Sequence, residues 1–528
     1  MSIELLLALP VMLPLAGAAA ALLARHHARL QAGLAIATLA AVAVVSAVLA
    51  LHVAEHGTLV LQIGRWTPQL GIVLVVDRLS ALMLVVSSIV TLAVLVYSSA
   101  QSVSESSERT PVAIYHPTYL VLVAGVAIAF VAGDLFNLYV GFEVLLSASY
   151  VLLTLGGSAS RIRAATTYVI VSLLSSLLFL AGVGAIYAAT GTVNMAELAL
   201  RLDRIEPGPR LALEMILLVA FAIKAAIFPL SAWLPDSYPT APAPVTAVFA
   251  GLLTKVGIYA IIRLETLLFP ASVISDLLLA AAGLSLLVGI LGALAQTDLK
   301  RVLSFTLVSH MGYMLLGIGL STLVSMGATV YYVVHHITVQ SALFLSAGLI
   351  EARGGTTNLA RLGGMAKVAP VIAVLFFVPA MNLAGVPPLS GFIGKVGLIL
   401  AGIDVGSPEA WILVGIALVT SLLTLYAMGK IWNRAFWQPA SEEMAAELAD
   451  REVAPVMIGA TGALVVFSLL LTVLAGPLMA YTDAAAASVL ERTPYVSAVL
   501  GEDAAAQVQH RIGEDGQKVE LTQDGGGR

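Results

Sequence analysis

The sequence predicts an all-α membrane protein with about 14 transmembrane helices. Hydrophobic residues make up 59% of the 528 residues, whereas charged residues make up only 11%. The mean hydropathy is +0.99, and apolar runs of about 20 residues recur along nearly the whole chain. Only helices and closed barrels satisfy the backbone in lipid, and the alternating pattern of barrel strands is absent. We therefore expect spanning helices.

Polar clusters separate the apolar runs from one another. The predicted spans cover residues 3–24, 30–52, 75–100, 117–133, 135–156, 165–190, 210–235, 243–266, 274–296, 301–320, 324–350, 368–403, 409–436 and 453–480. The first span has no basic region before it and is followed by Arg25 and Arg29. We therefore interpret it as an anchor that remains in the mature protein and not as a cleaved signal peptide.

Basic residues are concentrated in alternate loops between these spans. These loops hold Arg25, Arg29, Arg109, Arg161, Arg163, Lys300, Arg301, Arg353, Arg361, Lys367, Lys430, Arg434 and Arg451. The positive-inside rule predicts that they are cytoplasmic, which places both termini outside. The polar, glycine-rich and alanine-rich tail over 481–528 is predicted to form a short helix followed by disorder.

Several classes of function are excluded by what the sequence lacks. The chain has no cysteine, so it cannot use thiolates to hold an iron–sulfur cluster or to attack a substrate. It contains no P-loop, dinucleotide-binding glycine motif, metalloprotease HExxH motif or basic tract for nucleic acid. We expect no cofactor on this chain, and redox chemistry or ATP hydrolysis would take place on another protein of the same complex.

A few ionisable residues lie inside the spans, where each costs several kcal/mol unless it is paired or hydrated. Glu143 lies near the middle of the fifth span, with Tyr139 and Ser147 one turn away on the same face. Lys224 lies in the middle of the seventh span, and Lys255 in the middle of the eighth. Because the two lysines outnumber the carboxylate, we favour proton transfer over a permanent Glu143–Lys224 ion pair that only fixes packing.

Three histidines supply groups that titrate near neutral pH. His310 lies in the tenth span, and His335 and His336 lie next to each other in the eleventh. Neighbours on a helix point about 100° apart, so we expect only one of the adjacent pair, His336, to face the other site residues. A neutral histidine that hydrogen-bonds two helices is the structural alternative for each.

The twelfth span is predicted to be two half-helices, because Pro387 and Pro388 cannot continue a regular helix. Lys395 follows this break; a simple kink with a lysine reaching for the interface is the alternative. The Pro-Leu-Ser-small-aromatic pattern at 388–392 repeats the one that begins at Pro229 in the seventh span. In the predicted topology these two spans run in opposite directions, which is typical of an inverted-repeat transporter.

Asp134 begins the fifth span, nine residues before Glu143 and on the opposite helical face. This position fits an N-cap and an outward-facing cation site equally well. It is our candidate for a Na⁺ site.

Four stretches of the sequence resemble one known family. They are GFEVLLSASYVLL, FAIKAAIFPLSAWLPDSYPTAPAPVTAVFAGLLTKVG, DLKRVLSFTLVSHMGYMLLGIG and AGVPPLSGFIGKVGLIL. Together they are similar to the proton-translocating antiporter-like subunits shared by multisubunit Mrp antiporters and respiratory complex I. The length of the chain is closest to the D-type branch of the Mrp proteins.

The resemblance implies a fold and a set of residue roles. Helices 1–3 (1–100) would precede two inverted five-helix repeats, 117–266 and 274–436, with broken helices at spans 7 and 12, followed by helix 14 (453–480). Glu143 and Lys224 would form the coupling pair and Lys255 the central relay. His310 and His336 would be bridging groups and Lys395 the terminal lysine. The secondary candidates are His335, Asp134, Tyr139 and Ser147.

The implied function is proton translocation in a multisubunit Na⁺/H⁺ antiporter of the cell inner membrane. The expected partners are H⁺, Na⁺, lipid and Mrp proteins of the A, B, C, E, F and G types. The chain would be part of a secondary transporter and not an enzyme. The alternative is a proton-pumping component of a complex I-like NADH dehydrogenase or of a membrane hydrogenase, which would use the same residues.

Overall fold

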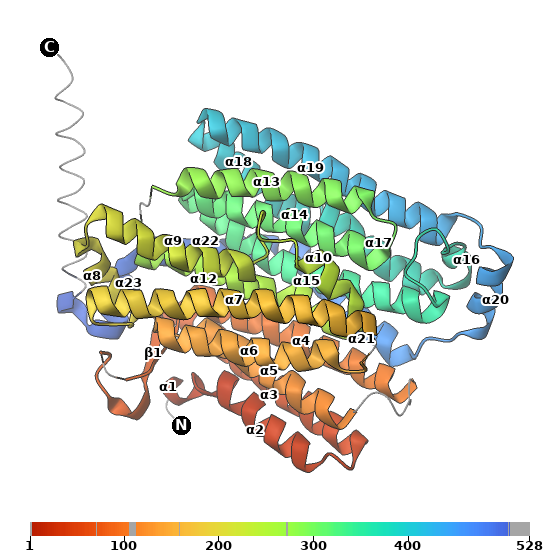
Figure 1. Cartoon of the computed structure of the whole chain (residues 1–528), viewed down its shortest axis with the longest axis horizontal. Helices are drawn as coiled ribbons and strands as arrows, with labels where there is room; N and C mark the ends of the chain where they lie inside the picture. The colour runs from red at the N-terminus through yellow and green to blue at the C-terminus, as the bar shows by residue number, and fades with distance from the viewer. Residues whose placement is uncertain are drawn as a thin grey trace.

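The computed structural model describes residues 3–69, 71–104, 112–157, 159–270, 273–504 and 506. Arg109 and nearly all of the tail beyond 504 lie outside these residues. Within them the chain forms a bundle of long helices that lie side by side (Figure 1). By length and composition, 11 of the described helices can cross a membrane, which confirms the predicted fold class.

In the first half of the chain most helices lie close to the predicted spans, but the seventh span, predicted over 210–235, ends as a regular helix at Lys224. Its helices are α1 (Ile3–Leu6), α2 (Leu9–Leu23), α3 (Ala28–His56), α4 (Arg78–Ser104), α5 (Val112–Val131), α6 (Leu135–Thr154), α7 (Ala159–Thr190), α8 (Met195–Arg201), α9 (Pro207–Lys224), α10 (Leu234–Ser237), α11 (Ala243–Val248) and α12 (Thr254–Arg263). The π-helical turns η4 (Phe249–Leu253) and η5 (Leu264–Leu268) flank α12.

The second half holds the helices α13 (Ser275–Ala295), α14 (Leu299–Leu320), α15 (Leu323–Gly354), α16 (Met365–Val368), α17 (Pro370–Ala384), α18 (Ser390–Val405), α19 (Pro408–Trp432), α20 (Glu442–Asp450), α21 (Pro455–Val473), α22 (Ala475–Leu490) and α23 (Arg492–Leu500). The predicted end of the last span at 480 falls inside α22. Because α2, α17 and α18 are short and α9 carries three charged residues, the total of about 14 spans stays a prediction.

One β-hairpin is present that the sequence interpretation omitted. Strands β1 (Leu59–Gln62) and β2 (Val73–Val76) pair antiparallel, with Leu59 opposite Val76. The amide of Gly133, just before α6, donates to the carbonyl of Val73. The hairpin therefore ties the start of α4 to the start of α6 at one end of the bundle.

Two helices are broken at the predicted prolines. α9 ends at Lys224, and no regular helix follows until α10; the Phe228–Pro229 peptide bond in this interval is cis. α17 ends at Ala384 and α18 begins at Ser390, with a cis bond between Pro387 and Pro388. Gly385 ends α17 with a φ of 86°, a left-handed conformation that glycine adopts at little cost.

An Asp–Asn contact recurs at opposite ends of the bundle. Asp134, before α6, pairs with Asn194 after α7, and Asp298, before α14, pairs with Asn358 after α15. We call these two contacts the outer and the inner clasp. Asn194 precedes α8 at one end of Figure 1, and Asn358 precedes α16 at the other end. Equivalent contacts on opposite sides are the geometry of an inverted repeat.

The predicted cytoplasmic loops gather at the α16 and α20 end (Figure 1). Ion pairs link these loops, among them Lys300 with Glu351 at 2.6 Å, Arg301 with Asp236 at 2.8 Å and Arg361 with Glu443 at 3.4 Å. The β-hairpin, α8 and α23 lie at the opposite end, which the positive-inside rule makes the outer end.

The centre of the bundle is α15. The whole apolar stretch of this helix is buried, whereas α7 and α19 expose large apolar side chains on one side. These exposed side chains suit contact with lipid or with neighbouring membrane chains.

Candidate functional site: buried lysines and histidines

Lys224, Lys255 and Lys395 are all buried inside the bundle. In the described part of the chain, none of the three forms an ion pair with a carboxylate. Each ammonium donates instead to a hydroxyl or to a backbone carbonyl. The local backbone supplies most of these acceptors, because each lysine lies next to an irregular stretch of its helix.

Lys224 is the last residue of α9, directly before the first break. Its Nζ donates to the hydroxyl of Ser176 on α7 over 3.1 Å and lies 4.8 Å from the centre of the Phe142 ring. A small cavity of about 20 Å³ adjoins it, lined in part by Tyr168 and Ser172. A cavity of about 10–15 Å³ already accommodates one water molecule, so a hydrated contact at this lysine is feasible.

Glu143 lies near Lys224 but does not contact it. Among the described residues the two form no ion pair, and Glu143 Oε1 has no hydrogen-bond partner. The carboxylate still acts on Lys224 electrostatically. The Lys224 ammonium points toward α7, where it donates to Ser176. Glu143 and Lys224, the expected coupling pair, are therefore not in contact in this structure.

The face of α6 that carries Glu143, Tyr139 and Ser147 lies toward the side of the bundle. Glu143 and Tyr139 are half-buried, and Ser147 is exposed. Tyr139 makes an edge contact with Phe179 on α7, with ring centres 5.7 Å apart. Tyr139 and Ser147 therefore flank Glu143 and stay away from the buried lysines.

Lys255 follows the π-helical turn η4 and is completely buried. A π-turn shifts the hydrogen-bond register and leaves a carbonyl available inside a helix. The Nζ of Lys255 donates to the carbonyl of Ala250 in this turn over 2.6 Å. α12 also packs closely on the first break, because a Cβ added to Gly257 would lie 2.7 Å from the amide nitrogen of Ala225.

Lys395 binds the end of the other half of its broken helix. Its Nζ donates to the carbonyls of Leu383 and Ala384, at 3.1 and 3.0 Å, where α17 ends. The last carbonyls of a helix lack intrahelical partners and carry the negative end of its dipole. The break therefore builds the binding site for the ammonium group.

The three histidines lie between the lysines. His310 and His336 have ring centres 5.2 Å apart, and His310 Nδ1 is 2.6 Å from the hydroxyl of Tyr332. Neither ring nitrogen of His336 has a hydrogen-bond partner among the described residues. Lys255 and Lys395 both act on His336 electrostatically.

His335 also lies against a residue of this region, although only its neighbour, His336, was expected to face the other site residues. Its Nδ1 lies 2.9 Å from the hydroxyl of Ser390, the first residue of α18. Both neighbours face site residues because α15 is surrounded on all sides, so directions 100° apart both lead into protein.

Comparisons with known proteins place the chain in a family. Residues 132–424 match the family described as the NADH:quinone oxidoreductase/Mrp antiporter transmembrane family. The chain belongs to this family. It is 41% identical to the D-type protein of the Na⁺/H⁺ antiporter of Alkalihalophilus pseudofirmus, over 94% of this chain and 99% of that one. It is 36% identical to the D-type protein of the Na⁺/H⁺ antiporter of Bacillus subtilis, with the same coverage.

A solved structure is similar over the same length. The match is a chain of the Mrp complex from Dietzia sp., with a TM-score of 0.88 and 33% identity, covering 95% of this chain and 100% of that one. Membership of the antiporter family and the fold class predicted from the sequence are both confirmed.

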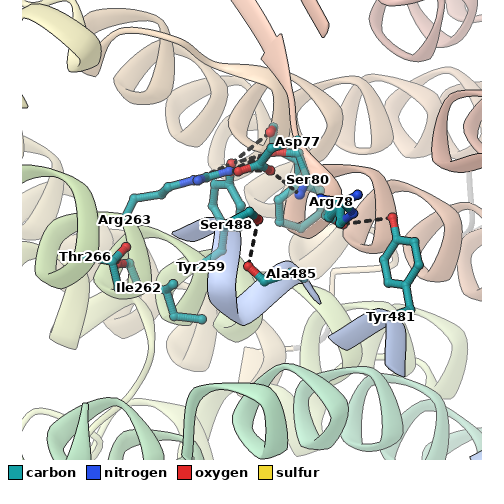
Figure 2. Close-up of polar contacts among 11 residues, drawn as sticks. Asp77, Arg78, Ser80, Tyr259, Ile262, Arg263, Thr266, Tyr481, Ala485 and Ser488 are labelled. Atoms are coloured by element: carbon teal, nitrogen blue, oxygen red, sulfur yellow. Dashed lines mark hydrogen bonds and ion pairs between the residues drawn. The ribbon is translucent and has the colours of Figure 1, made fainter. Parts of the chain in front are cut away.

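This member of the antiporter family also has a buried ion pair that the sequence interpretation missed. Arg263 binds Asp77 over 2.7 Å and donates to the hydroxyls of Tyr259 and Ser80 (Figure 2). Burial alone would raise the pKa of Asp77, but Arg263 holds that pKa below its usual value. A sequence signal was available, since Lys255, Tyr259 and Arg263 recur every four residues on one helical face.

Asp134 is an N-cap, one of the two roles expected for it. Its Oδ1 accepts from the amide of Asn137 over 2.6 Å, and burial raises its pKa to about 6. In the described ranges no group of three or more His, Cys, Asp or Glu side chains is placed to hold a metal ion. The Na⁺ site expected at Asp134 is not among such groups and stays a prediction.

Proposed function

We propose that this chain is the proton-translocating component of a multisubunit Na⁺/H⁺ antiporter, in which Lys224, Lys255 and Lys395 carry the protons. The observation that supports this role is the buried row of titratable groups whose ammonium ions bind hydroxyls and carbonyls. Such a lysine can release a proton without leaving an uncompensated carboxylate in the bilayer. A lysine in a structural ion pair cannot do so, because its deprotonation would leave the partner carboxylate buried and unpaired.

Relatives over nearly the full length support the assignment to the D-type proteins of Mrp complexes. The chain is a multi-pass membrane protein of the bacterial cell membrane and a transporter component rather than an enzyme. Its partners are the other proteins of that complex. The complex I-like pump is less supported, because the relatives with the highest identity belong to antiporters.

The geometry suggests an order for proton movement. Protons would pass from Lys224 to Lys255, through His336 and His310, and on to Lys395. Glu143 would regulate the first step, because a movement of its carboxylate changes the charge acting on Lys224. Proton entry down its gradient then drives Na⁺ export through the assembled complex. In this scheme residues 117–266 and 274–436 act as the two repeats.

The test is cation-dependent collapse of a pH gradient in everted vesicles that contain the whole complex. Lys224→Ala is expected to abolish the Na⁺ response while the complex still assembles. Lys430→Ala is the control, because this lysine lies at the cytoplasmic end, where its Nζ donates to the backbone carbonyls of Leu294 and Gln296. Full activity of Lys224→Ala would refute the assignment, and a wild type without any Na⁺ response would favour the redox-linked pump.

A further inference from the structure

The two clasps are built alike in most of their contacts. Oδ1 of Asp134 accepts from the amide of Asn137, and Oδ1 of Asp298 accepts from the amide of Arg301. The two asparagines play matching roles as well, since Oδ1 of Asn194 accepts from the amide of Ala196, and Oδ1 of Asn358 from that of Ala360. Each aspartate therefore begins the second helix of its repeat.

The clasps differ at the second carboxylate oxygen. Oδ2 of Asp298 accepts from the hydroxyl of Thr357. Val193 stands where Thr357 stands in the inner clasp, directly before the asparagine, and it has no hydroxyl to donate. Oδ2 of Asp134 has no hydrogen-bond partner in the described structure, and neither has Nδ2 of Asn194, although the two residues are only 5% and 2% exposed.

An unsatisfied buried polar atom destabilises the folded state, and a charged one does so more strongly. Protonation removes most of this cost, because a carboxylic acid is neutral. Burial raises the pKa of Asp134 to about 6, against the amides of Asn137, Phe136 and Val73, which lower it. In the inner clasp both carboxylate oxygens of Asp298 accept a hydrogen bond, from the amide of Arg301 and the hydroxyl of Thr357.

We propose that Asp134 exchanges protons between this chain and the outer aqueous phase, whereas Asp298 is its purely structural counterpart. The proposal rests on the proposed function, and it adds Asp134, as a proton-exchanging group at the outer end, to the buried lysines. The outer clasp lies at the outer end of the bundle, beside the β-hairpin and α8 (Figure 1).

Charged and titratable groups from several elements surround this end. They are Asp77 before α4, Glu197 on α8, Arg263 at the end of α12, and Arg492 and Tyr495 on α23. Tyr495 interacts electrostatically with Asp134 and places its ring 5.5 Å from the guanidinium of Arg263. Arg263 in turn binds the hydroxyl of Tyr259, as Figure 2 shows.

The polar face of α12 connects this group with the central lysine. Lys255, Tyr259 and Arg263 are four residues apart and so span about 12 Å along one side of the helix. The hydroxyl of Tyr259 also donates to the carbonyl of Phe130, close to the start of α6. A row of polar side chains thus leads from mid-membrane toward Asp134.

The decisive comparison is Asp134→Asn against Asp298→Asn in the assembled complex. Asparagine caps a helix about as well as aspartate, so both variants keep the clasp, but neither new side chain ionises. Antiport is measured in right-side-out vesicles while the external pH is varied from about 5 to about 8, a range that brackets an ordinary and a raised carboxyl pKa. We expect Asp134→Asn to be slower by about 100-fold or more, the usual effect of losing a proton-transfer group, and Asp298→Asn to match the wild type.

A second pair of variants tests the missing donor. Val193→Thr is nearly isosteric and supplies Asp134 with the hydroxyl that Thr357 gives Asp298. It favours the ionised carboxylate, so the midpoint of the external pH profile is expected to shift to lower pH. Thr357→Val removes the donor from the inner clasp and is expected to leave that profile unchanged.

Three outcomes would overturn the proposal. They are an unchanged rate and pH profile in Asp134→Asn, an equal loss in both Asp→Asn variants, and an altered Na⁺ half-saturation with an unchanged pH profile. Lys224→Ala in the same vesicles separates the two proposals. If Lys224→Ala is inactive and Asp134→Asn is fully active, only the proposed role of Asp134 is refuted. An active Lys224→Ala refutes the proposed function itself.

Discussion

At the scale of single residues, the three lysines differ in what binds the ammonium group. A serine hydroxyl binds Lys224, one π-turn carbonyl binds Lys255, and the two last carbonyls of α17 bind Lys395. A helix end favours a cation more than a single hydroxyl does. The three ammonium groups therefore lie in chemically distinct sites, although each belongs to a lysine.

The hydroxyl of Tyr332 orients His310, and this contact gives a prediction. Tyr332→Phe removes the hydrogen bond to Nδ1 and leaves the imidazole without a fixed tautomer, so antiport is expected to slow roughly tenfold. Tyr331→Phe is the control, because the neighbouring hydroxyl donates to the carbonyl of Leu471, away from the histidines. Rates are compared in everted vesicles; equal losses in the two variants would contradict the prediction.

The raised pKa of Asp134 predicts a pH-dependent stability. Its pKa is about 6 in the folded protein against 3.8 ordinarily, so the contribution to stability is complete below about pH 4 and is lost as the pH rises through 6. The loss amounts to at most about 3 kcal/mol. Asp134→Asn has no such loss, so its Tm relative to wild type should rise between about pH 4 and about pH 7. Thermal unfolding of the purified complex would show this, and a constant difference would contradict it.

At the scale of elements, each lysine lies beside an interruption of its helix. The two proline breaks were predictable, because Pro229 and the Pro387–Pro388 pair cannot continue a helix. The π-turn before Lys255 was not, because FAGLL has no residue that requires it. The β-hairpin was also missed, since its short, valine-rich second strand cannot be distinguished from the start of the apolar helix that follows.

The close packing of α12 on the first break gives a prediction at this scale. A Cβ at Gly257 would lie 2.7 Å from the amide nitrogen of Ala225, so Gly257→Ala must push α12 away from Lys224. We expect a loss of about 1–3 kcal/mol in stability and slower antiport. Gly184→Ala is the control, because no atom lies within 4 Å of the added group. Thermal unfolding of both variants tests this; equal Tm values would refute it.

At the scale of the whole molecule, the site residues extend through both repeats. The sequence predicted the breaks in the two helices, and it indicated the candidate site residues because buried charges are rare and conspicuous in apolar spans. The contacts between those residues were not predictable, since they depend on packing; the separation of Glu143 from Lys224 is one example. The clasps had a sequence signal in TVNMAEL and TTNLARL, which occur at matching positions.

A continuous row of proton carriers predicts non-additive effects. Lys224→Ala and Lys395→Ala should each abolish antiport, and the double variant should be no worse than either one, because both interrupt the same process. Initial rates in everted vesicles with equal amounts of assembled complex provide the measurement. Substantial antiport in each single variant that disappears only in the double variant would indicate two independent routes.

The burial of α15 determines which site residues a reagent dissolved in lipid can reach. This helix and its histidines are enclosed by protein on every side, whereas α6 presents Glu143 at the side of the bundle. A lipid-soluble carbodiimide, which modifies carboxylic acids, should therefore label Glu143 in the isolated chain. Within the complex the same labelling would reveal whether a neighbouring protein covers that side, so Glu143 would report on assembly as well as on proton transfer.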